Sequence, residues 1–85
     1  MSRNEINEWV VQWFAKHALR TEEEIATNSS KNYFELKYVD SFAFINLLSD
    51  IEDKYDIVFS NEVFEDRSFS TIDGLIEMIE KELPQ

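Results

Sequence analysis

A serine stands at the start of a predicted helix in this chain of 85 residues. Ser41 follows Asp40 and precedes an amphipathic pattern that runs from Phe42 to about Tyr55. The first amides of a helix have no intrahelical acceptor, and the helix dipole favours negative charge there. A phosphate attached to the Ser41 hydroxyl would therefore be stabilised. Taken alone, an Asp-Ser pair in this place is usually only a helix cap, a role open to either residue.

His17 is the only histidine, so it is the first candidate for a base that would activate Ser41. It lies near the end of a predicted helix, where a histidine is also expected for the helix dipole alone. A serine nucleophile needs a base, an orienting group and an oxyanion hole. We therefore predict that the chain is not an enzyme and that another protein supplies the base. An enzyme that uses scattered carboxylates is an alternative, but no feature of the sequence beyond charge favours it.

A group of acids superficially suggests a calcium loop: Asp50, Glu52, Asp53 and Asp56. An EF-hand that began at Asp50 would need Gly at position six and Glu at position twelve, but those positions hold Tyr55 and Asn61. The chain has no cysteine, and its single glycine excludes a Gly-rich nucleotide loop. We therefore predict no metal site, and any thiol must come from an added group.

Negative charge dominates the chain and is unevenly spread. Eighteen acids against eight bases give a net charge of −10, which argues against nucleic acid as a partner. Residues 40–66 hold eight acids and one base, whereas residues 1–20 have a net charge of +1. This excess is either a solvated surface or a docking face for basic proteins. Its position directly after Ser41 favours the docking face.

The length predicts one small domain over residues 1–85. A hydrophobic share of 44% with twelve aromatic residues (seven Phe, three Tyr and two Trp) indicates a folded chain. No apolar run approaches the ~18 residues of a membrane span. Residues 1–20 carry charges throughout and lack a signal-peptide core, so we expect a cytoplasmic protein.

Helical periodicity predicts the elements that position Ser41. A first helix, from about Arg3 to Leu19, carries an apolar stripe of Ile6, Trp9, Val10, Trp13 and Phe14. Its two Trp could form an aromatic binding box, but the continuous stripe favours the core. Residues 20–40 have no sustained period and predict a long loop that folds back on isolated apolar anchors: Ile25, Tyr33, Phe34 and Leu36.

The second helix is expected from Asp40 or Ser41 to about Tyr55. Its predicted core stripe is Ile45, Leu48, Ile51 and Tyr55, widened by Phe44 and Leu47. An extended linker over residues 57–59 and a short helix over residues 60–64 follow.

The last helix is expected to open with the capping-box sequence Ser70-Thr71-Ile72-Asp73 and to stop at Pro84. Its predicted stripe is Ile72, Leu75, Ile76, Ile79 and Leu83. The patterning thus predicts an all-α four-helix bundle with a long first loop and a short third helix.

Several short segments occur in an order and spacing typical of one family. They are Asn32-Tyr33-Phe34-Glu35-Leu36, Asp40-Ser41-Phe42, Leu47-Leu48, Ile51-Glu52-Asp53-Lys54-Tyr55, Asp56-Ile57 with Phe59, and Phe69-Ser70-Thr71-Ile72. Together these segments resemble the acyl and peptidyl carrier proteins, in which an Asp-Ser-Leu motif follows a segment such as Asp-Phe-Phe-Glu-Leu-Gly. The resemblance covers roughly Asn32 to Leu83.

The resemblance implies a 4′-phosphopantetheine arm on Ser41, attached by a phosphopantetheinyl transferase from coenzyme A with magnesium. The thiol of the arm would carry an acyl or aminoacyl group as a thioester, and the protein would shuttle it between biosynthetic enzymes. Asp40 would mark the site and cap the helix, and the protein would be a monomer, the state that suits a carrier. Phe42 and Phe44 would give exposed apolar contacts at the docking face. Four acids would attract basic patches on partner enzymes: Asp50, Glu52, Asp53 and Asp56.

The chain also departs from the family pattern. Lys37 stands where many relatives have Gly, so we expect the backbone there to avoid conformations that strain a side chain. Phe42 replaces the usual Leu. The cargo is open between fatty acyl, polyketide, aminoacyl and D-alanyl groups, and residues 33–36 slightly favour an amino-acid or specialised carrier.

A second hypothesis is an unmodified acidic helical module that binds a basic partner through Phe42 and Phe44. The two hypotheses differ in whether a transferase modifies Ser41.

Overall fold

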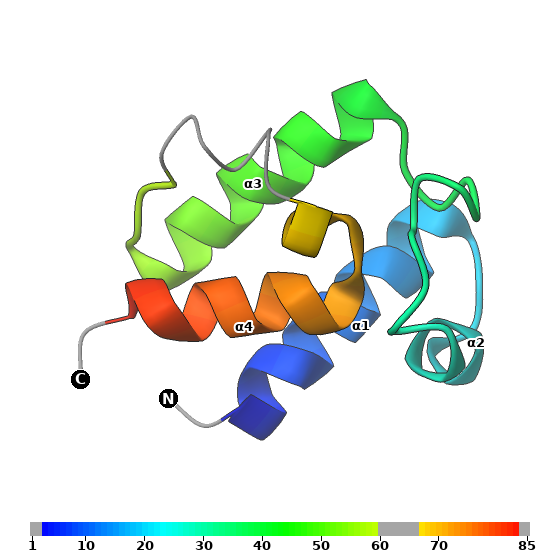
Figure 1. Ribbon diagram of the computed structural model, residues 1–85, viewed down its shortest axis with the longest axis horizontal. Helices are drawn as coiled ribbons and strands as arrows, with labels where there is room; N and C mark the ends of the chain where they lie inside the picture. Colours follow the sequence, from blue (N-terminus) through cyan, green and yellow to red (C-terminus); the bar gives the residue numbers. More distant parts are fainter. Residues whose placement is uncertain (1–2, 60–66, 84–85) are drawn as a thin grey trace.

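A computed structural model describes residues 3–59 and 67–83 of the chain. These residues form four α-helices: α1 (Arg3–Ala18), α2 (Glu22–Thr27), α3 (Ser41–Tyr55) and α4 (Ile72–Glu82). A 3-10 helix, η2 (Arg67–Ser70), leads into α4. Figure 1 shows α1 crossing behind α4, with α3 above α4 in this view and α2 at one end. The predicted all-α bundle is confirmed, and the described residues contain only one isolated bridge, between Asn32 and Thr71.

The predicted stripes of the first and last helices form a large part of the core. Trp13 is 6% exposed and Trp9 is partly buried against the core, as the continuous stripe predicted. All other members of these stripes within the two helices are buried: Ile6, Val10, Phe14, Ile72, Leu75, Ile76 and Ile79. Among the described residues the core contains no buried charged or polar residue type. Apolar burial therefore fixes how these two helices pack.

The predicted phase of α3 is wrong at its first turns. Phe44 is 6% exposed, and Ile45 is 56% exposed. The buried residues of α3 are Phe44, Leu47, Leu48, Ile51 and Tyr55. With 100° per residue, this set spans a narrow arc of the helix, and Ile45 lies at the edge of the solvent face. The larger ring at position 44 therefore takes the core position.

The predicted first loop contains the short helix α2, which periodicity missed. Its six residues are too few to show a period, and only Ile25 is buried. Thr21 caps its start by accepting a hydrogen bond from the Glu24 amide at 3.1 Å. The Tyr38 hydroxyl donates to Glu24 Oε2 at 2.8 Å and accepts from Asn28 Nδ2 at 3.1 Å. These bonds fasten α2 to the segment before α3.

Within residues 3–59 and 67–83, three residues other than glycine have a left-handed backbone: Leu19 (φ 58°), Lys37 (φ 61°) and Asp56 (φ 55°). Each is followed by an amide that donates to the carbonyl five residues earlier. The N···O distances are 3.0 Å for Arg20 to Ala15, 3.0 Å for Tyr38 to Tyr33 and 3.2 Å for Ile57 to Glu52. This is the bond of a Schellman turn, which requires the left-handed residue. The expectation that Lys37 avoids a strained conformation is therefore wrong.

The start of α4 lies one residue later than predicted. Thr71, not Ser70, is the cap, and its hydroxyl accepts from the Gly74 amide at 3.0 Å. Ser70 instead ends η2, and its carbonyl accepts from the Tyr33 amide at 2.9 Å. The predicted short helix over residues 60–64 and the predicted stop at Pro84 lie outside the described residues.

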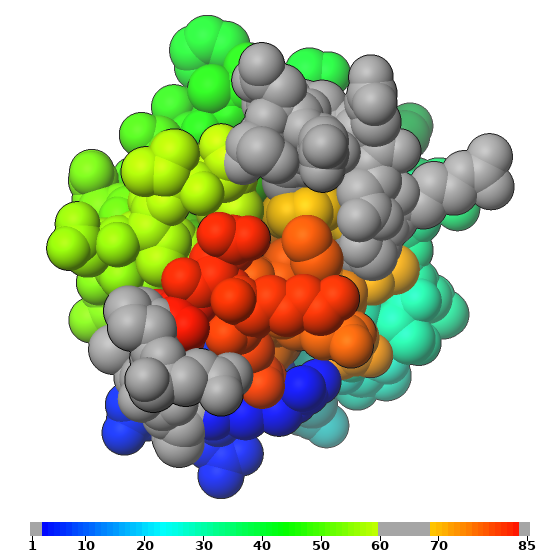
Figure 2. Space-filling view, turned by 60° about the vertical axis from the view of Figure 1, so that its left-hand side comes forward, coloured from blue at the N-terminus to red at the C-terminus, as the bar shows by residue number. Residues whose placement is uncertain are grey.

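The segment after α3 lies beside the end of α4 (Figures 1 and 2). Ile57 is buried in the core and Val58 is 79% exposed. The Phe59 ring meets the Phe69 ring edge-on, with 5.5 Å between centroids. Alternate residues of this segment thus point inward, as an extended linker requires.

Candidate functional site

Ser41 is the first residue of α3, and its side chain is exposed. No hydrogen bond joins its hydroxyl to the part of the chain that the structure describes. The amides of Ser41 and Phe42, in the first turn, have no intrahelical acceptor. The hydroxyl is therefore open to another protein, beside amides that favour an anion.

Asp40, and not Ser41, caps the helix. Its backbone is extended (φ −105°, ψ −176°), and its carboxylate accepts a hydrogen bond from the Ala43 amide at 2.8 Å. Its carbonyl accepts from the Phe44 amide at 2.9 Å, which is the first intrahelical bond. Because Asp40 does the capping, the Ser41 hydroxyl is not needed to hold the helix end. The predicted role of Asp40 as a cap is confirmed.

An aromatic cluster underneath this turn holds it in place. The cluster consists of Phe14, Tyr33, Phe34 and Phe44. The Tyr33 ring lies 4.9 Å from Phe14 and 6.2 Å from Phe44 between centroids, and Phe34 lies 5.1 Å from Phe44. The cluster connects α1, the loop and the first turn of α3, so burial of these rings fixes where Ser41 is presented.

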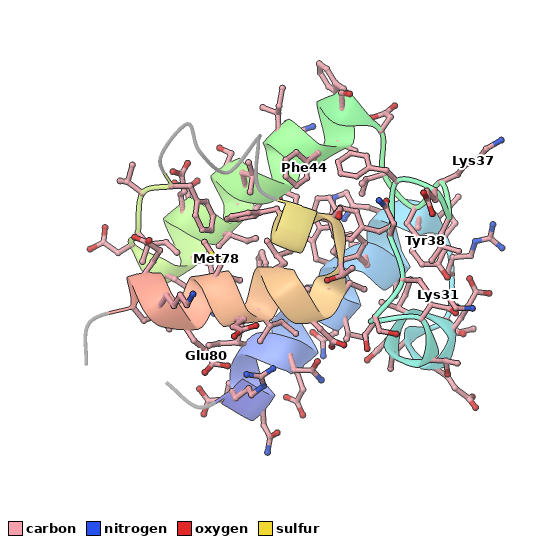
Figure 3. All side chains as sticks on the ribbon, viewed as in Figure 1. Lys31, Lys37, Tyr38, Phe44, Met78 and Glu80 are labelled. Atoms are coloured by element: carbon pink, nitrogen blue, oxygen red, sulfur yellow. The ribbon has the colours of Figure 1, made fainter. Side chains whose placement is uncertain are left out.

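The prediction that Phe44 is an exposed docking residue is therefore wrong. Figure 3 shows Phe44 beneath α3, within the molecule, whereas Lys37 extends away from it. A ring in the core at position 44 leaves position 45 on the surface. Ile45 joins Phe42, which is 76% exposed, as a second exposed apolar side chain near Ser41. The helical spacing of three between positions 42 and 45 is the signal that could have identified this pair.

The loop before Ser41 has a defined shape. Asn32 Oδ1 accepts from the amides of Phe34 at 2.8 Å and Glu35 at 3.1 Å, which opens a single turn over residues 32–37. The left-handed Lys37 ends this turn and sends the chain toward Asp40. Within the aromatic cluster, the Tyr33 side chain is fully buried and its hydroxyl has no partner among the described residues. Burial raises the pKa of Tyr33.

The four predicted docking acids have different surroundings. Asp53 and Asp56 are exposed, and Asp56 is the left-handed C-cap of α3. Asp50 is exposed, but one carboxylate oxygen accepts from Trp13 Nε1 at 2.8 Å. Glu52 is half-buried and accepts from the Phe59 amide at 2.9 Å, so it holds the linker. Asp53 and Asp56 are therefore the acids of this set with the greatest freedom to meet a partner.

A depression of about 570 Å³ lies beside Ser41. Its walls come from the end of α1, the loop and the start of α3: His17, Phe34, Lys37, Tyr38, Val39, Asp40, Ser41 and Ala43. His17 Nδ1 donates to the Trp13 carbonyl at 2.8 Å, and the two rings stack at 3.8 Å with 11° between their planes. His17 thus lines the depression but is held on Trp13. Burial and the hydrogen bond to Glu24 raise the pKa of Tyr38, another wall residue.

The described residues bring together no group of three or more His, Asp or Glu side chains that could hold a metal ion. Among the same residues, no helix is both long and apolar enough to cross a membrane.

The surroundings of Ser41 fit a phosphodiester-linked arm. The hydroxyl that would be joined to phosphorus is exposed, and the first-turn amides and the side chains of His17 and Lys37 lie around it. The carboxylate of Asp40 is turned to the Ala43 amide, which satisfies one of its oxygens. The depression gives the arm room to leave the serine without moving a core residue.

A comparison with protein-family models matches residues 8–79 to the family described as phosphopantetheine attachment site. Comparisons with curated proteins and with solved structures gave no match. Carrier domains of this kind are generally not catalytic, and they work with phosphopantetheinyl transferases and biosynthetic enzymes. The family model spans most of the chain and includes α3 with its exposed serine. The chain therefore belongs to the phosphopantetheine attachment family, whose domains carry 4′-phosphopantetheine as a covalent cofactor.

Proposed function

We propose that the chain is a single-domain carrier protein that bears 4′-phosphopantetheine on Ser41 and shuttles an acyl or aminoacyl group between biosynthetic enzymes. The observation that carries the proposal is the exposed Ser41 hydroxyl at the first residue of α3, with Asp40 as the cap. When bound, the arm supplies a thiol, which forms a thioester with the cargo. The chain itself has no cysteine.

The attachment is a phosphoryl transfer catalysed by another protein. The Ser41 oxygen forms a bond to the phosphorus of coenzyme A that bears pantetheine, and the bond from that phosphorus to adenosine 3′,5′-bisphosphate breaks. A base of the transferase takes the hydroxyl proton, and its magnesium neutralises the leaving phosphate. The part of this chain is to present the hydroxyl and to stabilise the new anion with the first-turn amides of α3.

Docking is proposed to use the outer face of α3. Phe42 and Ile45 provide apolar contact near Ser41, and Asp53 and Asp56 lie on the same face of the helix toward its end. Exposed acids steer basic partners and accelerate association, while a small apolar patch gives affinity without making the complex long-lived. This combination suits a protein that must visit several enzymes.

The test is the intact mass of the protein after incubation with a phosphopantetheinyl transferase, coenzyme A and magnesium. We expect a gain of one phosphopantetheine, lost in Ser41→Ala and kept in Ser49→Ala, which changes another exposed serine of α3. The alternative function is an unmodified acidic module that binds a basic partner. It predicts no mass gain in any variant and full partner binding by Ser41→Ala.

A further inference from the structure

Two further depressions follow the seam between α1 and α3. One of about 370 Å³ is lined by Trp9, Gln12, Trp13, Lys16, His17 and Asp50. The next, of about 260 Å³, reaches Tyr55 and shares the walls Trp9 and Gln12. His17 is common to the first of these and to the depression beside Ser41. The three depressions therefore adjoin one another along this seam, and the first of them lies beside Ser41.

Aromatic side chains form a fixed floor for this seam. Trp13 spans from α1 to α3, where its indole nitrogen donates to Asp50 at 2.8 Å. Trp9 meets the ring of Tyr55 edge-on, with 5.9 Å between centroids. The His17 ring stacks flat on Trp13, so it does not project as a barrier between the neighbouring depressions. A flat, rigid floor of this kind binds an extended chain at small entropic cost to the protein.

We propose that the arm on Ser41 lies along this seam, with its thiol at the level of Trp13 and Asp50. This inference rests on the proposed function. An extended arm has about thirteen bonds from phosphorus to sulfur, or ~15 Å at ~3.5 Å for every three backbone bonds. Position 50 lies nine residues after position 41 on α3, which is ~14 Å at 1.5 Å per residue. Along the helix axis, the extended arm is therefore long enough to reach the level of Asp50.

The chemistry along the seam matches the order of groups in the arm. Lys37 lines the depression beside Ser41, so positive charge is nearest the anion, and Lys16 lines the next depression. Gln12 and Lys16 are exposed and offer hydrogen bonds to the two amides of the arm. The dimethyl group of the arm is close to the phosphodiester, so it would lie in the depression beside Ser41, where Phe34 offers apolar contact. The cargo would then begin over Trp9.

The absence of cysteine makes a direct test possible. The holo-protein is prepared with a transferase, and its mass confirms a single arm. A maleimide nitroxide then labels only the arm thiol, because the chain has no other. In ¹⁵N-resolved spectra we expect strong broadening of the Gln12 and Trp13 amides and of both indole N–H signals, reversed by ascorbate. The amides of Ile25 in α2 and Glu77 in α4 are expected to keep their intensity.

A pair of variants tests the path itself. Gln12→Tyr places a larger side chain in the seam and is expected to abolish the selective broadening. Asn7→Tyr makes the same change at an exposed position on another face of α1 and is expected to preserve it. A confirmed mass gain with equal broadening on α1, α2 and α4, or a Gln12→Tyr spectrum like that of the native protein, would overturn this inference and leave the proposed function intact. A missing mass gain would instead overturn the proposed function.

Discussion

Because the backbone of Lys37 is left-handed, we expect its replacement by Gly to stabilise the fold, whereas Gly at most other positions would destabilise it. A side chain at φ 61° crowds its Cβ against the following carbonyl, at a cost of roughly 1–2 kcal/mol. Lys37→Gly removes this cost, and the greater freedom of Gly in the unfolded chain takes back about 0.4–1 kcal/mol. The free energy of unfolding should therefore rise by about 0.5–1 kcal/mol. For a domain of this size the midpoint of thermal unfolding should rise by about 2–8 °C.

Lys31 provides the matched control. It is exposed and lies in the same connection between α2 and α3, but it is not among the residues with positive φ. Both lysines are marked in Figure 3. Lys31→Gly makes the same change in charge and composition, yet it should lower the free energy of unfolding by about 0.4–1 kcal/mol. Lys37→Ala removes the charge and keeps Cβ, so its stability should stay near that of the native protein.

The assay is urea and thermal unfolding followed by circular dichroism at 222 nm for the three variants. Strain at Lys37 would be disproved if Lys37→Gly were no more stable than Lys37→Ala, or if both glycine variants shifted in the same direction.

Three further predictions concern the aromatic cluster and the docking face. Phe44→Ala should lower the free energy of unfolding by about 3–5 kcal/mol because it empties a core position. Phe42→Ala should change the free energy of unfolding by less than about 0.5 kcal/mol. Urea unfolding compares the two variants, and equal effects would contradict the burial of Phe44. Tyr33→Phe should raise the free energy of unfolding by about 1 kcal/mol, since the buried hydroxyl has no partner. Burial raises the pKa of Tyr33 in the folded state, so the unfolded chain loses this proton first and stability falls as the pH rises above ~10. In Tyr33→Phe the fall should be shallower, and an unchanged slope between pH 9 and 11 would contradict this. Ile45→Ser should lower the kcat/KM of a transferase for this protein. Val58→Ser makes a similar apolar-to-polar change at a more exposed residue and should leave kcat/KM unchanged. An equal loss in both variants would show that Ile45 is not part of the docking face.

The sequence was sufficient to place the start of α3. An Asp-Ser pair before an amphipathic pattern specifies a cap and a first turn through local hydrogen bonds, so no tertiary information was needed. The stripes of α1 and α4 were equally local, because each repeats over several turns. The start of α4 was displaced by one residue because both Ser70 and Thr71 can cap, and the bond from the Tyr33 amide to the Ser70 carbonyl decides between them.

The remaining features depend on contacts between distant segments. Phe44 and Ile45 are adjacent apolar residues, and only the rings of Tyr33 and Phe34 select Phe44 for the core. Helix α2 depends on the hydrogen bond from Tyr38 to Glu24, fourteen residues apart in the sequence. The left-handed turn at Lys37 is imposed by the turn that Asn32 opens and the 3.0 Å bond between Tyr38 and Tyr33. Patterns of residue type along the sequence do not reveal these contacts, because the contacts join segments that are distant in the sequence.

The arm is expected on one oxygen atom, that of the Ser41 hydroxyl, and fragmentation mass spectrometry of the protein purified from its own cells detects it there. We expect the phosphopantetheine mass, with or without a cargo, on the peptide that contains Ser41 and on the Ser41 residue itself. An arm located on Ser49 or on any other hydroxyl, or a protein that is unmodified in cells with an active transferase, would contradict the account.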